Sequence, residues 1–194
     1  MKNSIQHFIE KGIPELEKIK INLMKNPAIF DKCVEEVLQV VLQIACCFVC
    51  EWLEECNNLL ESSAKRRGSW YVKDHGQKSI LTPIGSITFT RTRFINKETN
   101  ETAYLLDKIF GWEPHTRLSD GTKACILEAA AQTSYEKAGE SACLGEDRVS
   151  RQTVMRQVRS MEMPSQGREE VNEKRKVKYL YVEADEDHIS LQYK

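Results

Sequence analysis

The last residues of the chain combine an alternating pattern with carboxylates. Glu183, Asp185 and Asp187 stand two residues apart, and the positions between 180 and 184 alternate with apolar residues. Because the side chains of a strand alternate between its two faces, these three carboxylates would share one face and leave an apolar back. Carboxylate oxygens are the ligands that Mg²⁺ prefers. The pattern predicts a strand that offers metal ligands, and no acidic residue follows Asp187 to complete the site.

A second set of chemistry-bearing residues is basic. Ser150 is a typical helix N-cap, and the helix it predicts over 151–159 begins Arg151-Gln152-Thr153. At about 100° per residue, Arg148, Arg156 and Arg159 project in similar directions, with Arg151 about a sixth of a turn away. Arginine and glutamine are the side chains that bond guanine and adenine edges in the major groove. This helix is predicted to bind DNA, and a plain helical hairpin is the alternative.

Two further caps place this helix in a larger unit. Ser119 predicts the start of a helix that runs through Ala131, and Thr133–Glu136 has the pattern of a capping box that opens a short helix to about Cys143. A turn containing Gly145 then separates this helix from the one that Ser150 caps. Two short helices joined by such a turn are typical of a helix-turn-helix. We therefore expect a DNA-binding region over residues 119–163.

Residues 80–112 have the period and composition of strands. β-Branched and aromatic residues alternate over 80–95, and a polar turn over 96–101 separates them from a second apolar segment, 102–106. This predicts a β-hairpin module, with a third strand at Ile80–Leu81. Arg91 and Arg93 share one face of it and could contact a phosphate backbone. Alternatively, they are exposed charges that protect a sheet edge.

The segment before the hairpin, residues 65–79, is basic and contains Trp70 and Tyr71. It is predicted to be a linker. Basic residues with aromatic residues between them can bind nucleic acid, and a solvated linker whose aromatic side chains pack back onto the core is the alternative.

The N-terminal region, residues 1–64, is predicted to be helical. A first helix over 3–24 is expected to break near Pro14, and a second extends over 28–62 with an apolar stripe from Val34 to Trp52. The breadth of the stripe allows either a homodimer or an intramolecular bundle. The apolar run over 37–50 is short for a bilayer span and is more typical of a core helix, so no membrane contact is expected.

Composition limits the remaining possibilities. The chain has 194 residues, a formal net charge of −1 and 41% hydrophobic residues, so DNA binding would have to rest on local patches. Its seven cysteines are an odd number and five of them crowd into one helical segment, which indicates a reducing compartment and not a disulfide framework. The pair Cys47 and Cys50 has metal-site spacing without a second pair, and is interpreted as packing. With no secretory signal at the N-terminus, a cytoplasmic location is expected.

Together these patterns predict an α+β fold. Its parts are N-terminal helices, a small β-hairpin module, a helix-turn-helix and, over residues 176–194, a strand that carries carboxylates.

Three blocks of sequence resemble a known family. They are Gly85–Thr92 with Tyr104–Asp107, Ala129–Ala138 with Val149–Val154, and Leu180–Asp185. In this order and at this spacing they resemble the N-terminal half of bacterial insertion-sequence transposases of the ISLre type, long catalogued as an uncharacterised protein family. The resemblance covers roughly residues 65–194.

The resemblance implies an enzyme that cuts DNA and transfers strands, with an RNase H-like domain whose three carboxylates hold two Mg²⁺ ions. Residues 176–194 would be the first strand of this domain, which the chain does not complete. It makes Asp185 the first carboxylate and a metal ligand, with Glu183 and Asp187 as alternatives. Members of the family continue beyond this point, where the other two carboxylates lie. The chain is therefore expected to be a truncated, catalytically inactive transposase fragment that keeps the DNA-binding elements for the ends of the insertion sequence and holds no cofactor itself.

The patterns predict DNA contact for residues in two elements: Arg148, Ser150, Arg151, Gln152, Thr153, Arg156 and Arg159 in the helical region, with Arg91 and Arg93 in the hairpin. Two other functions remain open at this stage. One is a complete helix-turn-helix DNA-binding protein, and the other is a helical protein that dimerises through the stripe over 34–52.

Overall fold

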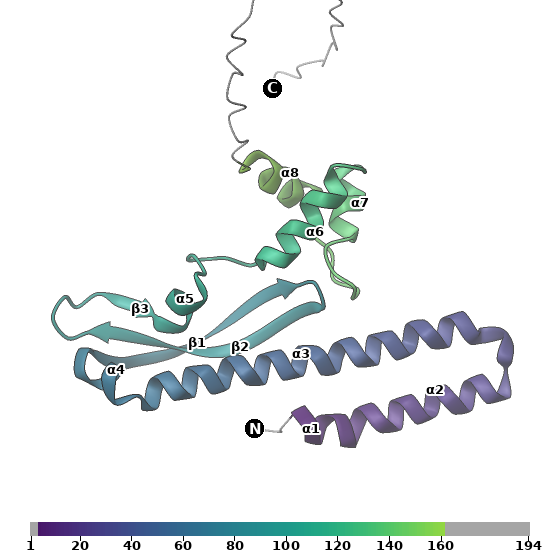
Figure 1. Cartoon of the computed structure of the whole chain (residues 1–194), viewed down its shortest axis with the longest axis horizontal. Helices are drawn as coiled ribbons and strands as arrows, with labels where there is room; N and C mark the ends of the chain where they lie inside the picture. The colour runs from purple at the N-terminus through teal and green to yellow at the C-terminus, as the bar shows by residue number, and fades with distance from the viewer. Residues whose placement is uncertain (1–3, 162–194) are drawn as a thin grey trace, which may run out of the picture. The chain divides into compact units, whose positions relative to one another are not determined.

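The structure is a computed structural model, and it describes residues 4–161 of the chain. Figure 1 shows the order of the elements, which confirms the α+β class. The helical elements are α1 (Ser4–His7), a π-helical turn (Phe8–Gly12), α2 (Ile13–Lys25), a 3-10 turn (Pro27–Ile29), α3 (Phe30–Ser62), α4 (Ala64–Ser69), α5 (Leu105–Phe110), α6 (Asp120–Ala130), α7 (Tyr135–Glu140) and α8 (Arg151–Arg159). The strands are β1 (Trp70–Thr82), β2 (Gly85–Asn96) and β3 (Thr102–Tyr104).

The long predicted helix is present as α3, which pairs with α2 in an N-terminal helical hairpin. Ile19 of α2 and Cys33 and Val40 of α3 form a small buried core between the two helices. The predicted break near Pro14 is present as the π-helical turn, after which α2 begins at Ile13 with Pro14 in its first turn.

The sheet is an antiparallel ribbon with a short third strand. β1 pairs with β2 from Trp70 opposite Asn96 to Thr82 opposite Gly85, with a bulge between Val72 and Asp74. β3 adds only three residues to the far side of β2, at positions 93–95. The predicted second apolar segment is therefore divided, because the chain turns into α5 at Leu105.

The prediction of a linker over 65–79 was wrong for most of that segment. Residues 64–69 form α4, and residues 70–79 are the first ten of β1. The strand there is formed by its pairing partner, because side chains such as Tyr71 and Lys73 remain exposed and show no buried face in the local sequence. The basic and aromatic composition of this segment correctly indicated that it is exposed to solvent. The linker conformation inferred from the same composition was wrong.

Helix α3 lies along the edge of β2 and completes its hydrogen bonding. Asn57 Oδ1 accepts from the backbone N–H of Thr92 at 2.7 Å, and its Nδ2 donates to the Thr92 hydroxyl at 2.9 Å. One turn earlier, Glu54 Oε1 accepts from the N–H of Thr90 at 3.1 Å. β3 pairs only beyond these positions, so side chains of a helix take the place of a neighbouring strand. Leu53 of α3 packs beside them into the core of the sheet.

The last three described helices pack on one another. Their core consists of Ile126 of α6, Ala138 of α7 and Val154 of α8, with Ala142 just after α7, all fully buried. The hairpin holds this cluster at its tip, where Leu81 N donates to the carbonyl of Arg117 at 2.8 Å and Leu81 O accepts from Ser119 N at 2.9 Å. These bonds form a joint between the tip of the hairpin and the segment before α6, and they place the three helices at that tip.

Replacement of Asn57 tests the contact between α3 and the sheet edge. Asn57→Ala leaves the buried N–H of Thr92 without its partner, and we expect the free energy of unfolding to fall by about 1–3 kcal/mol. Urea denaturation followed by circular dichroism measures the change. Asn58→Ala, at the exposed neighbouring position, is the matched control and should leave the midpoint unchanged. Equal midpoints for both variants would contradict the role of Asn57.

Candidate nucleic-acid interface

Helix α8 is positioned by one cap and one buried side chain. Ser150 Oγ accepts from Thr153 N at 3.3 Å, which confirms the predicted start of the helix. Val154 is the fully buried residue that faces the three-helix core. Since every other residue of α8 is exposed or half-buried, the helix presents most of its circumference to solvent.

The backbone between α7 and α8 approaches α7 very closely at Gly139. Val149 N donates to the carbonyl of Gly139 at 2.9 Å. A Cβ on Gly139 would lie 2.0 Å from the carbonyl oxygen of Val149, which is a clash with backbone. The connection itself covers residues 141–150, which is longer than the three or four residues of an ordinary helix-turn-helix. Close packing at Gly139 compensates for this length and keeps α8 against α7.

The solvent face of α8 is basic and has no partner within the described residues. Arg151, Gln152, Arg156 and Arg159 are all exposed, and none forms a hydrogen bond or ion pair through its side chain in residues 4–161. Between positions 148 and 161 the chain has four arginines and no acidic residue. A groove of about 650 Å³ runs beside this face, where Arg151 and Gln152 stand opposite residues 134–136 at the start of α7.

Three other predicted contact residues have partners already. Arg148 forms an ion pair with Glu140 at 3.1 Å, with both side chains more than half exposed. The hydroxyls of Ser150 and Thr153 bond to each other at 3.0 Å as part of the cap. These residues therefore support the helix. The basic side chains without a partner in residues 4–161 are Arg151, Arg156 and Arg159.

The hairpin arginines do not form the open pair that either prediction described. Arg93 Nε donates to Asp74 Oδ1 at 2.9 Å, and this bond holds the pKa of Asp74 below its usual range. Arg91 is largely buried: its guanidinium lies 3.6 Å from the centre of the Tyr104 ring and bonds to Asp107. Both predictions placed these side chains in solvent, and the contacts come instead from β1, β3 and α5.

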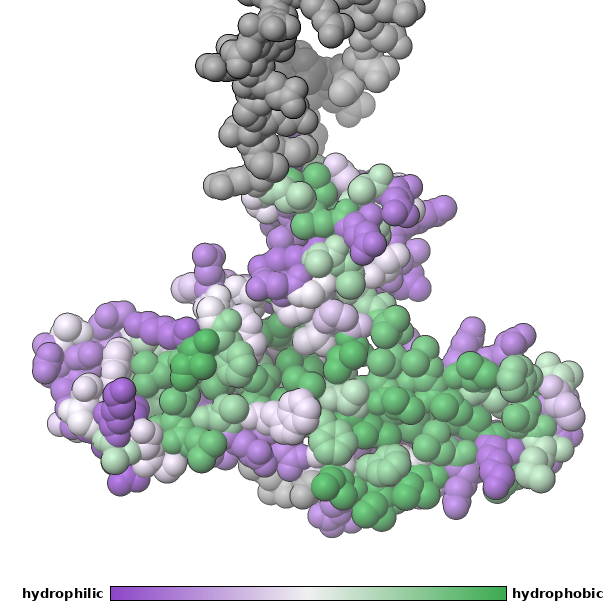
Figure 2. Space-filling model, in the orientation of Figure 1, coloured by the Kyte–Doolittle hydropathy of each residue, from purple (hydrophilic) through white to green (hydrophobic). Residues whose placement is uncertain are grey.

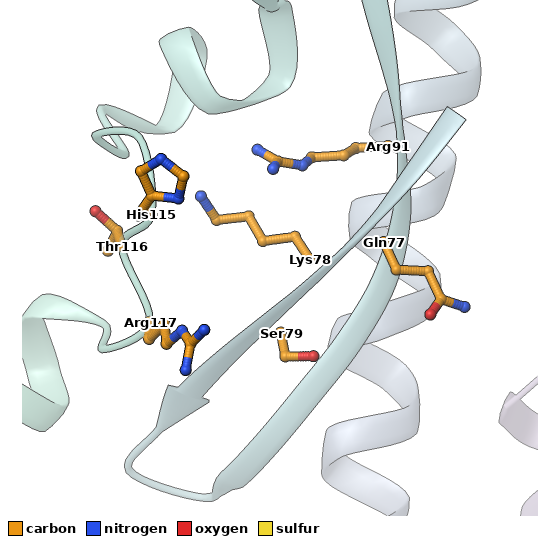
Figure 3. Close-up of a pocket in the computed structure, with 7 residues that line it drawn as sticks. All are labelled: Gln77, Lys78, Ser79, Arg91, His115, Thr116 and Arg117. Carbon is orange, nitrogen blue, oxygen red and sulfur yellow. The ribbon is translucent and has the colours of Figure 1, made fainter. Parts of the chain in front are cut away.

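Arg91 contributes to a cationic pocket of about 440 Å³ between the sheet and the loop before α6. Figure 3 shows Lys78 and Arg91 reaching from the two long strands toward His115, with Arg117 beside them. The other lining residues are Gln77, Ser79 and Thr116, so none of the seven is acidic. The structure thus assembles basic side chains from positions 78, 91 and 115–117, far apart in the sequence.

The charge beneath this pocket is unbalanced. Lys78 Nζ lies 3.1 Å from Asp107 Oδ2, the same oxygen that pairs with Arg91, so two cations share one carboxylate. Burial lowers the pKa of Lys78, and the nearby positive charge of Arg91 lowers it further. Arg91 Nε and Asp107 Oδ1 are buried and have no hydrogen-bond partner among residues 4–161. A bound anion would relieve the excess positive charge, because desolvated charges are costly unless they are paired.

Sequence reasoning missed Lys78, His115 and Arg117. Lys78 stands between polar residues in the segment predicted to be a linker, and Arg117 lies in a loop with no motif. The bridge between Leu81 and Leu118 brings the two segments together. That bridge depends on the tertiary fold, so no local signal could have located the pocket.

The predicted carboxylate site cannot be placed. Asp185, with its alternatives Glu183 and Asp187, lies outside the described residues, as does the predicted RNase H-like segment 176–194. Within residues 4–161, no group of three His, Cys, Asp or Glu side chains could hold a metal ion. Cys47 and Cys50 are free cysteines, half-buried in α3.

Comparison with known proteins identifies the family. The model of an uncharacterised protein family, UPF0236, matches residues 23–194. The chain belongs to UPF0236. A UPF0236 protein of Caldanaerobacter subterraneus subsp. tengcongensis is 30% identical over 178 residues, which is 92% of this chain and 38% of that protein. A second UPF0236 protein of the same organism is 34% identical over 140 residues, 72% of this chain and 29% of the relative.

The chain thus spans less than two fifths of the length of these relatives. No solved structure matches it.

Substitution of Gly139 tests how α8 is held. Gly139→Ala places a methyl group against the carbonyl oxygen of Val149, and overpacking of this kind costs about 1–3 kcal/mol. We expect a lower unfolding temperature by circular dichroism. The control is Gly68→Ala, because a Cβ at Gly68 meets nothing within 4 Å. A Gly139→Ala protein as stable as the Gly68→Ala protein would show that the close approach is not a constraint.

Proposed function

We propose that this chain binds double-stranded DNA through α8, as the DNA-recognition part of an insertion-sequence transposase. The observation that carries the proposal is the exposed basic face of α8, with Arg151, Arg156 and Arg159 and no acidic residue over 151–159. Arginine contacts to phosphate supply most of the affinity of such surfaces. The family resemblance in the blocks around residues 129–138 and 149–154 supports the same function.

The dimensions of α8 suit a major groove. With its side chains an α-helix is about 10–12 Å in diameter, and the major groove is about 12 Å wide. Arg151 and Gln152 stand in the first turn, the part of a recognition helix that meets base edges. Arg156 and Arg159 stand in the last turn and would contact phosphates.

Charge is segregated along the chain, which explains how a net charge of −1 agrees with DNA binding. Helix α3 has seven acidic residues and one lysine over 30–62. Its acidic surface would be repelled by DNA, whereas α8 and the pocket around Arg117 would be attracted. Long-range electrostatics would therefore orient the molecule as it approaches the duplex.

The cationic pocket of the hairpin would hold a second phosphate group. Its exposed member, Arg117, has no ion pair within residues 4–161, and the excess positive charge beneath it favours an anion. Contacts of this kind add affinity without sequence preference, because every nucleotide presents the same phosphate.

Loss of the first-turn side chains tests base recognition. A preferred duplex is first selected from a random pool, and binding is then measured by fluorescence anisotropy. We expect Arg151→Ala/Gln152→Ala to bind this duplex about 10–100-fold more weakly, since one good base contact is worth about 1–3 kcal/mol. Binding to a scrambled duplex should change much less.

Lys123→Ala is the matched control for charge, because Lys123 lies on α6 and pairs with Asp120. It should keep the sequence preference. If the double variant retains the full preference, α8 is not the recognition helix.

Removal of Arg117 tests the phosphate contact. Arg117→Gln should weaken binding to all duplexes alike, and the slope of log Kd against log salt should fall by about one. Arg67→Gln, an exposed arginine outside the pocket, is the control. An unchanged slope for Arg117→Gln would exclude a phosphate at this pocket.

A further inference from the structure

Helix α3 has a second apolar stripe, on the side away from its buried contacts. Figure 2 shows hydrophobic surface over α2 and α3. The outward stripe, called the seam here, consists of Val34, Leu38, Val41, Ala45, Phe48, Trp52 and Leu59. Val34 is 51% exposed, Trp52 is 60% exposed and Leu59 is 70% exposed, whereas Ala45 and Phe48 are half-buried. Within residues 4–161, the chain leaves most of this stripe exposed.

The seam has a strict period. Successive members lie four, three, four, three and four residues apart, and Glu55 occupies the one intervening position before Leu59. Alternating steps of four and three residues are the spacing of a coiled-coil contact, in which each side chain inserts between four residues of a facing helix. The inward face of α3 has no comparable regularity, because Asn57 and Glu54 there bond to β2.

The area of the seam is large enough for a specific interface. From their exposed fractions, Val34, Leu38, Val41, Trp52 and Leu59 together present on the order of 500 Å² of apolar surface, near the upper end for the largest patch on a monomer. A symmetric pair of such surfaces would bury about 1,000 Å², which is the lower limit for a specific protein interface.

We propose that a second copy of this chain covers the seam, with the two α3 helices antiparallel. The orientation follows from the sizes and charges of the side chains. A parallel pair would place Trp52 against Trp52, Ala45 against Ala45 and the carboxylate of Glu55 against its own copy. That arrangement combines a clash, a void and a repulsion of like charges.

An antiparallel pair that crosses between Ala45 and Phe48 removes all three problems. It sets Phe48 of one copy against Ala45 of the other, and Trp52 against Val41, so that each large side chain faces a small one. Val34 meets Leu59 at the two ends. The two Glu55 carboxylates are then separated, and each lies near the edge of the contact beside Leu38. The contact is isologous, as expected for a two-fold dimer.

Two other occupants are possible outcomes. The stretch Pro27–Ser62 is long and apolar enough to cross a membrane by length and composition. Its hydrogen bonds to β2 and its seven acidic residues over 30–62 argue against that, because insertion would separate the helix from the sheet. The other occupant is a part of the longer family members outside this chain.

The first test is the oligomeric state of the protein at micromolar concentration by sedimentation equilibrium. We expect a dimer, and we expect Val41→Glu to shift the dissociation constant at least tenfold toward monomer. Gln43→Glu adds the same charge to an exposed position of α3 outside the seam and should remain a dimer. A monomeric wild-type protein overturns the proposal, as does co-flotation with neutral phosphatidylcholine vesicles.

The second test fixes the orientation within one chain. In an antiparallel pair, the carboxylate introduced by Val41→Glu faces the ammonium introduced by Trp52→Lys on the other copy. The variant Val41→Glu/Trp52→Lys should therefore regain dimer relative to either single variant. In a parallel pair each new charge faces its own copy, so the double variant would dissociate further. That result would overturn the antiparallel arrangement. Circular dichroism checks that every variant keeps its helices.

Discussion

The side chains of α3 that complete the edge of β2 determine much of the rest of the structure. Outward N–H groups of the strand at residues 90 and 92 meet Glu54 and Asn57 of the helix. These two bonds join alternate residues of the strand to successive turns of the helix, and they fix the position of the helix along the strand.

Once α3 is fixed along β2 in this way, the position of the helix determines what each of its other faces contacts. Its N-terminal half packs against α2 through Cys33 and Val40, and its C-terminal half packs into the sheet through Leu53. The seam is the remaining side. The same helix is acidic, so the surface proposed for self-association and the basic surface proposed for DNA belong to separate parts of the chain.

Local features of the sequence predicted the helices well and the site less well. The caps at Ser119 and Ser150 are confirmed, because a cap is a bond between a side chain and a backbone N–H three residues later. The capping-box pattern placed the third cap at Thr133, and the structure has it one residue later, at Ser134. The start of β1 at Trp70 was missed, since that half of the strand shows no buried face and is formed by its partner strand.

The environment of the hairpin arginines could not be predicted for a related reason. Two-residue spacing placed Arg91 and Arg93 on one face correctly, but Asp74, Tyr104 and Asp107 reach that face from three other elements. A period of two identifies which side chains share a face and says nothing about what covers it. Burial of Arg91 is thus a property of the tertiary fold.

The joint between the hairpin and the last three helices has an evolutionary consequence. Leu81 bonds to residues on both sides of Leu118, Leu144 N donates to the carbonyl of Pro83 at 2.7 Å, and Ser86 N donates to Asp147 at 2.8 Å. These bonds join the hairpin to the helical region across the connection at which recombination would separate the two. Recombination that moved the helical region to another protein would therefore have to carry the hairpin, and with it α3.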